Sequence, residues 1–153
     1  MDNSIKVVAS GKKWIGSGTI LTSTVVEELI NQSKTSLLIT SYVLSDYNLI
    51  NLIKNALEGG ITIELFIYKK ILNENIFKKI LSMNNKYIGL NLYLSREEEF
   101  IHSKVIIRDK TEVLIGSANL TNSGLTTNYE LGVLIKNPQV AYEIEKVIKK
   151  IGD

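Results

Sequence analysis

Three short apolar runs between residues 105 and 135 limit most narrowly what this chain can fold into. They cover residues 105–107, 113–115 and 129–135, and each is mostly apolar with residues that favour strands. Runs of this length and composition are typical of buried strands. Residues 109–111, which separate the first two runs, contain an aspartate that suits a turn. The sequence therefore predicts a β-hairpin, followed by a further interior strand.

Polar side chains stand at the ends of these runs. His102, the only histidine, and Lys104 precede the first run two positions apart, so their side chains project from one face. Ser117 and Asn119 follow the second run, and the hairpin returns them to the neighbourhood of His102. Glu130 lies near the start of the third run. We therefore expect one site that gathers these five side chains.

The residue types in this site favour phosphoryl transfer. A carboxylate in an apolar strand needs a partner, and an imidazole N–H is the obvious candidate for Glu130. Such a contact fixes the tautomer of His102 and leaves its other ring nitrogen free to attack. Lys104, Ser117 and Asn119 would supply hydrogen-bond donors to a phosphate-like oxyanion.

The spacing of these residues resembles the HKD signature of the phospholipase D superfamily. The segment 102–130 carries the signature, and its downstream glutamate falls where the small bacterial nucleases of that superfamily carry theirs. In order, the matching positions are His102, Lys104, Asp109, Gly116, Ser117, Asn119 and Glu130.

This resemblance implies a metal-independent phosphodiesterase that needs no cofactor and uses two histidines. One histidine attacks phosphorus to form a phosphohistidine, and the other protonates the leaving oxygen. Carried over to this chain, His102 is the nucleophile or the acid, Lys104 and Asn119 hold the phosphate, Ser117 supports them, and Glu130 orients the imidazole.

The chain has only one histidine, whereas this mechanism needs two. Either the protein is inactive, or two copies each supply His102 to one site on a two-fold axis. We predict the second arrangement, an obligate homodimer.

A nuclease is the favoured activity, because the chain is short, has a single motif and shows no evident membrane-binding surface. We therefore expect nucleic acid and no membrane as partners. A phospholipase or another phosphodiesterase is the alternative, which an exposed apolar rim around the site would support. A further alternative is a gated dimeric DNA-binding or effector domain of a restriction or anti-phage defence system.

Asp109 is expected to act structurally. It lies an odd number of residues from His102 and at the turn, so its side chain should cap the hairpin rather than reach the site.

Three charged segments have both a functional and a structural interpretation. Lys12, Lys13 and Trp14 in the glycine-rich segment 11–18 predict either a phosphate-contacting loop that stacks a base or a loop whose tryptophan packs on the surface. The acidic run 96–99 is either a solvated loop or a narrowed entrance to the site. In the last turn of the C-terminal helix, the expected helix-dipole partners are Lys146, Lys149 and Lys150. Together with Lys78, Lys79 and Lys86 they are also the candidates for a nucleic-acid patch that follows the backbone.

The rest of the chain predicts an α/β fold with a layered mixed β-sheet flanked by helices, a phospholipase D-like fold in one domain over residues 1–153. Strands are expected at 5–8, 36–43, 61–67 and 88–94, and helices from residues 22–23, 46, 69 and 138. A net charge of +2 means that contacts with a polyanion must come from local clusters. There is no cysteine, so with one histidine neither a thiolate nor a histidine-rich metal site is expected within one chain. The first ten residues lack a signal pattern and no apolar run is long enough to cross a bilayer, which predicts a cytoplasmic protein.

Overall fold

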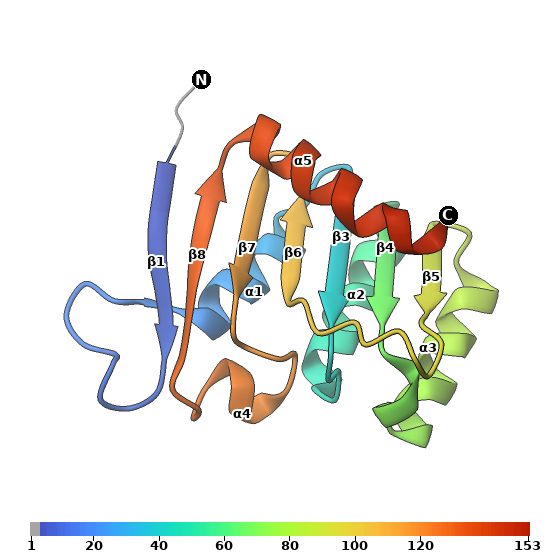
Figure 1. Cartoon of the computed structure of the whole chain (residues 1–153), viewed down its shortest axis with the longest axis horizontal. Helices are drawn as coiled ribbons and strands as arrows, with labels where there is room; N and C mark the ends of the chain where they lie inside the picture. Colours follow the sequence, from blue (N-terminus) through green and yellow to red (C-terminus); the bar gives the residue numbers. More distant parts are fainter. Residues whose placement is uncertain (1–3) are drawn as a thin grey trace.

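The computed structural model describes residues 4–153, which form a mixed eight-stranded sheet with helices on both faces (Figure 1). The strand order across the sheet is β2-β1-β8-β7-β6-β3-β4-β5. In chain order the strands are β1 (Ser4–Ser10), β2 (Ile20–Leu21), β3 (Ser36–Ser41), β4 (Thr62–Ile67), β5 (Leu90–Leu94), β6 (Val105–Arg108), β7 (Glu112–Gly116) and β8 (Glu130–Lys136). The predicted α/β fold class is confirmed.

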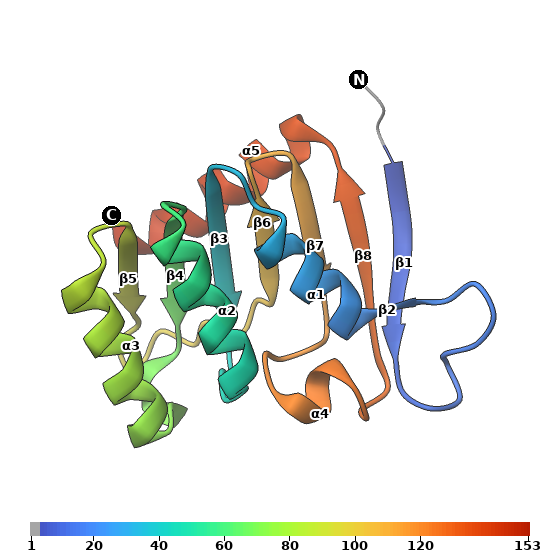
Figure 2. The same ribbon diagram turned by 180° about the vertical axis from the view of Figure 1, so that it is seen from behind.

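Helices cover the two faces of the sheet unequally (Figures 1 and 2). Three long helices lie on one face and α5 crosses the other diagonally. The helices are α1 (Thr22–Asn31), α2 (Tyr47–Glu58), α3 (Glu74–Lys86), α4 (Asn122–Leu125) and α5 (Pro138–Lys149), with short 3-10 turns η1 (Lys69–Ile71) and η2 (Lys150–Gly152). The larger part of the core lies under α1–α3, and a smaller cluster that includes Leu38, Val105, Val113 and Ala141 lies under α5.

The sheet combines a parallel half with an antiparallel half. β3, β4 and β5 run parallel, because α2 and α3 return the chain to the same edge between them. β6, β7, β8 and β1 alternate in direction, and the predicted hairpin pairs Ile106 with Leu114. β6 also runs antiparallel to β3 and joins the two halves.

Several predicted boundaries differ from the observed ones. The helix expected from residue 69 starts at Glu74, because the Asn73 side chain caps it by accepting from the amide of Asn75 at 2.8 Å. The strand expected to reach residue 43 ends at Ser41, whose hydroxyl donates to the Val43 carbonyl oxygen at 2.7 Å and turns the chain. The four-residue helix α4 was not predicted.

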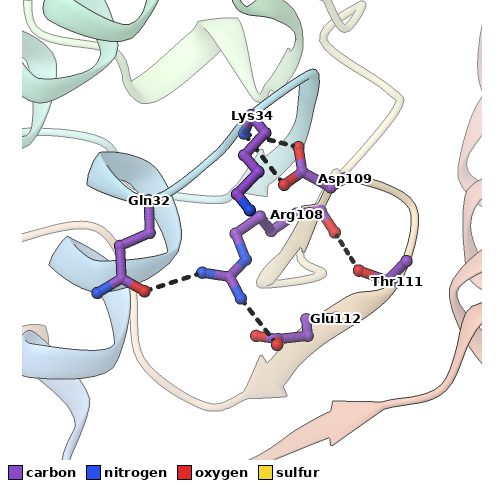
Figure 3. Close-up of polar contacts among 6 residues, drawn as sticks. All are labelled: Gln32, Lys34, Arg108, Asp109, Thr111 and Glu112. Atoms are coloured by element: carbon purple, nitrogen blue, oxygen red, sulfur yellow. Dashed lines mark hydrogen bonds and ion pairs between the residues drawn. The ribbon is translucent and has the colours of Figure 1, made fainter. Parts of the chain in front are cut away.

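The side chain of Asp109 joins the hairpin turn to a neighbouring loop (Figure 3). Asp109 and Lys110 have φ of 50° and 56°, the left-handed conformation that a tight hairpin turn requires. The carboxylate of Asp109 accepts from the backbone amides of Lys34, Thr35 and Ser36 at 2.8–3.1 Å. The sequence predicts that the Asp109 side chain caps its own hairpin. This prediction is wrong about its hydrogen-bond partners, because the loop before β3 lies within reach and offers three amides.

Asp109→Asn should weaken the fold in a pH-dependent way. Burial alone would raise the pKa of Asp109, but the amides of residues 34–36 and the Thr35 hydroxyl together lower it. Because the pKa of Asp109 is lower in the folded state, its charge stabilises the fold at pH values above its unfolded-state pKa of about 3.9. This stabilisation is lost as the pH falls through the lower pKa of the folded state. We expect urea unfolding at neutral pH to show a loss of about 1 kcal/mol, discounted for partial solvation.

The same measurement near pH 3 should show a smaller difference between Asp109→Asn and the wild type. Glu98→Gln, which removes an exposed carboxylate, is the matched control and should leave the unfolding free energy nearly unchanged. A loss for Asp109→Asn that is equal at both pH values would show that the charge of Asp109 is not what holds the loop.

Candidate active site

One edge of the sheet carries the predicted site residues. At this edge β6 and β8 begin, while β1, β3 and β7 end (Figure 1). Antiparallel pairing of β6, β7 and β8 puts the start of one strand beside the end of the next. Segments far apart in the sequence therefore supply His102, Lys104, Ser117, Asn119 and Glu130 to neighbouring positions.

Lys104 contacts His102 directly. Its ammonium donates to the His102 carbonyl oxygen at 2.7 Å and lies 3.2 Å from Nδ1 of the ring. Because an ammonium can only donate, this contact requires Nδ1 to accept, so the neutral ring carries its proton on Nε2. Burial lowers the pKa of Lys104, and the nearby charge of Glu130 partly offsets this. A partly desolvated cation thus lies beside an exposed imidazole.

A column of aromatic rings supports the imidazole from one side. The ring of Tyr42 lies 4.6 Å from that of His102 and stacks on Tyr68 at 5.4 Å. Tyr68 is buried, stacks in turn on Phe100 at 5.1 Å, and donates its hydroxyl to the Glu97 carbonyl oxygen. Neither tyrosine is predicted as a site residue from the sequence. The available signal was position, since each directly follows one of two neighbouring parallel strands, β3 and β4.

Ser117 and Glu130 form a second polar group. The Ser117 hydroxyl donates to the Glu130 carboxylate and accepts from the amide of Leu131 at 3.0 Å. The side chain of Asn128 donates to the other carboxylate oxygen at 3.4 Å. Within the described residues, Glu130 makes no hydrogen bond to His102, so the predicted orienting contact is absent inside one chain.

Asn119 is held by the segment that follows β3. Its side-chain oxygen accepts from the amide of Val43 at 3.2 Å, and the neighbouring amide of Leu120 donates to the Val43 carbonyl oxygen at 3.1 Å. With the oxygen fixed in this way, the orientation of the side-chain amide is set, and its NH₂ group keeps the donors that an oxyanion needs.

Two glycines let β7 and β8 approach closely next to Ser117. A Cβ on Gly116 would lie 2.6 Å from the Leu131 carbonyl oxygen and 2.7 Å from the Cα of Gly132. This explains why a glycine stands before Ser117. Any side chain there would push apart the strands that align Ser117 with Glu130.

Gly116→Ala should therefore destabilise the protein by about 1–3 kcal/mol through overpacking, measured by urea unfolding. Gly16→Ala is the control, because a Cβ on Gly16 meets no atom within 4 Å. Its effect should stay within about 0.5 kcal/mol. Equal stability of the two variants would mean that the β7–β8 approach can relax at no cost.

Two of the predicted charged segments are residues 12–14 and the acidic run 96–99, and both make contacts with aromatic or charged side chains. Lys12, Lys13 and Trp14 are exposed, in the loop between β1 and β2, and the Trp14 ring packs against Tyr129 at 5.2 Å. In the acidic run, Glu97 pairs with Lys70, and Glu99 accepts from the Tyr93 hydroxyl at 2.9 Å. The contact with Lys70 lowers the pKa of Glu97, and the Arg96 amide together with the Tyr93 hydroxyl lowers the pKa of Glu99.

The other predicted lysines do not form one patch with the site. Lys78 pairs with Glu74 on α3 at 3.2 Å, and Lys149 bridges Glu64 and Glu145 on the other face of the sheet at 2.9 and 2.6 Å. Across residues 4–153, no three His, Cys, Asp or Glu side chains come together as metal ligands. Over the same residues, no helix is long and apolar enough to cross a membrane.

Comparison with known proteins places this arrangement in a family. Residues 26–151 match the family described as "Cardiolipin synthase, PLD-like domain", where PLD stands for phospholipase D. The chain belongs to the PLD-like family. This confirms the resemblance that the sequence motif indicated, and the family match covers the whole of the candidate site.

Individual PLD-like proteins resemble this chain over different fractions of their own length. The DISARM protein DrmC of Bacillus paralicheniformis is 25% identical over 144 residues, which are 90% of this chain and 59% of DrmC. Cardiolipin synthase 2 of Staphylococcus epidermidis is 27% identical over 124 residues, 78% of this chain and 25% of the synthase. Among solved structures, the phospholipase D family member Nuc from Salmonella typhimurium has a TM-score of 0.80 at 23% identity, covering 98% of this chain and 94% of Nuc. The likeness to Nuc shows the fold.

Proposed function

We propose that this chain is a phosphodiesterase that cleaves nucleic acid at an active site shared by two copies. The observation that carries the proposal is the placement of one imidazole beside a partly buried ammonium, with a serine, an asparagine and a carboxylate on neighbouring strand ends. This set offers one nucleophile and several donors for a negatively charged oxygen.

In the proposed reaction, one His102 gives up the Lys104 contact at Nδ1 and takes the tautomer with its proton there, which frees the Nε2 lone pair. This Nε2 attacks phosphorus, and the ester oxygen leaves with a proton from His102 of the partner subunit. The covalent product is a phosphohistidine. Water then attacks the phosphorus, loses its proton to the second imidazole and frees the first. Lys104 and the Asn119 amide stabilise the non-bridging oxygens, where negative charge accumulates in both steps.

An uncovered part of the sheet next to the site supports the two-copy arrangement. Val7 pairs with Val133, Val133 with Ile115, and Ile115 with Val105, so these side chains share the face that α5 partly covers. α5 does not reach β1 and β8. The apolar side chains left exposed on these strands and on β7 are Ile5 (73%), Val7 (62%), Leu131 (53%) and Ile115 (37%).

A second copy suits this bare surface. α5 itself leaves Tyr142 and Val147 exposed, at 57% and 65%. In a two-fold dimer, α5 of each copy would cover the bare strands of the other and place the two His102 side chains near the axis. Glu130 of the partner subunit could then orient the imidazole, a contact that one chain does not make.

The choice of nucleic acid over lipid rests on the charged and aromatic side chains of the loop between β1 and β2. Lys12 and Lys13 add positive charge to a loop whose Trp14 packs against Tyr129, the neighbour of Glu130. A lipid phosphodiesterase is the second candidate, favoured by the exposed Phe100 (68%) two positions before His102.

The deciding experiment is cleavage in excess EDTA, beside the His102→Ala variant. The substrates are labelled single- and double-stranded DNA and RNA, and vesicles that contain phosphatidylglycerol. Cleavage of nucleic acid that resists EDTA and disappears in the variant supports the proposal. Turnover of the vesicles alone would move the assignment to lipid, and a folded, dimeric protein that cleaves neither would favour a gated binding domain.

A further inference from the structure

Trp14 and Tyr129 form an exposed aromatic pair beside the candidate site. Their ring centroids are 5.2 Å apart with an angle of 64° between the planes, and the residues are 51% and 47% exposed. A tryptophan that served only to fill the core would be largely covered. This pair instead leaves about half of its surface open to a ligand.

The backbone holds this pair in a fixed position relative to the site. Gly11 has φ of +98°, and a Cβ there would lie 2.4 Å from the Tyr129 ring, so the loop of residues 11–19 passes directly against Tyr129. The Gly11 amide donates to the Thr126 carbonyl oxygen at 3.3 Å, and the buried Ser10 hydroxyl donates to that of Asn128 at 2.9 Å. Tyr129 immediately precedes Glu130, so the pair lies directly beside the site.

Positive charge accompanies the aromatic pair. Lys12 and Lys13 precede Trp14 and are exposed, and in the part of the chain that the structure describes neither forms an ion pair. Aromatic faces flanked by cations suit single-stranded nucleic acid, in which the bases stack on the rings and the phosphates meet the cations. A duplex keeps its base faces inside its own stack and offers mainly phosphates.

We propose that Trp14 and Tyr129 form a platform that stacks an unpaired base of single-stranded DNA or RNA, with Lys12 and Lys13 on the adjoining phosphates. The proposal names the substrate class of the site and rests on the proposed function for that role. The stacking itself does not require hydrolysis. The same loop would also suit an anionic membrane surface, because Ile15 is 39% exposed, and the experiment separates these two ligands.

Trp14 is the only tryptophan of the chain, so its fluorescence reports directly on the platform. The titration uses the intact chain with His102→Ala, so that no ligand is cleaved. The ligands are a single-stranded oligodeoxynucleotide of about ten nucleotides, an abasic strand of equal length and a blunt duplex. We expect saturable quenching by the single strand and little by the abasic strand or the duplex.

Matched substitutions test the platform by the anisotropy of a labelled single strand. Trp14→Ala should weaken binding on the order of tenfold, whereas Trp14→Phe should keep most of the affinity, because its ring still stacks. Tyr47→Ala removes an aromatic side chain at the start of α2 that is 47% exposed, as Tyr129 is, and should leave the affinity unchanged.

Three outcomes would overturn the platform. The first is equal affinity for the abasic and the base-containing strand, and the second is unchanged affinity in Trp14→Ala. The third is a blue shift of the emission on phosphatidylglycerol vesicles with no quenching by any strand, which would assign the loop to a membrane surface. Because binding is measured in a variant that lacks His102, a failure of the platform is separate from a failure of the wild type to cleave.

Discussion

His102→Ala should lower turnover of the cleaved phosphodiester by at least about a thousandfold, because it removes both the attacking and the proton-donating imidazole from a shared site. His102 is exposed, and its contacts are with Lys104 and Tyr42. The variant should therefore keep the unfolding midpoint and the dimer mass of the wild type, measured by urea unfolding and light scattering. Retained turnover in a verified pure variant would remove His102 from the mechanism.

Mixed dimers test whether the site is shared. If equal amounts of wild type and His102→Ala exchange subunits at random, about one quarter of the dimers contain two histidines. At the same total protein concentration, a shared site predicts that the mixture has about one quarter of the turnover of unmixed wild type. Two independent sites predict about one half. The wild type mixed with Tyr47→Ala controls for losses during subunit exchange.

Val7→Asp should separate the two copies and abolish turnover with them. Val7 is 62% exposed in one chain, so a carboxylate there is solvated in the monomer. In the proposed dimer the same carboxylate would be buried without a partner, at a cost of about 3 kcal/mol or more in each subunit. We expect the dissociation constant of the dimer to rise at least about a hundredfold, measured by light scattering over a dilution series.

Lys6→Asp is the matched control for this substitution. Lys6 is the preceding residue of β1 and is also exposed, but its side chain points to the other face of the sheet. It should remain a dimer and keep its activity. If Val7→Asp also stays dimeric, the bare strands β1 and β8 are not the interface, and the second histidine would have to arrive by another surface.

The sequence predicted features that depend on short-range patterns. The hairpin 105–115 and the strand that begins at Glu130 are visible as apolar runs with polar ends, and β-pairing then carries Ser117 to Glu130. The partners of Asp109 could not be predicted in this way, because the amides it accepts from lie 73–75 positions earlier in the chain. No local pattern specifies which loop will lie beside a turn.

Tyr42 and Glu130 show a second limit of sequence reasoning. Tyr42 follows a strand of buried side chains and reads as a core residue until the structure puts its ring on His102. Glu130 was assigned to the imidazole on chemical grounds, and within one chain Ser117 and Asn128 occupy it instead. Complementary chemistry gives a set of possible partners, and only distance selects among them.

The opposite positions of the Asp109 turn and of the loop 11–19 bear on how such a protein can change over evolutionary time. The turn stabilises one end of the strands of the sheet. The loop lies at the opposite end of the strands, next to the candidate active site. With the platform as proposed, replacing the loop would change the ligand that it binds without disturbing the contacts that keep the strands in register. In this architecture, ligand selectivity can therefore diverge between related proteins while the stability of the fold is conserved.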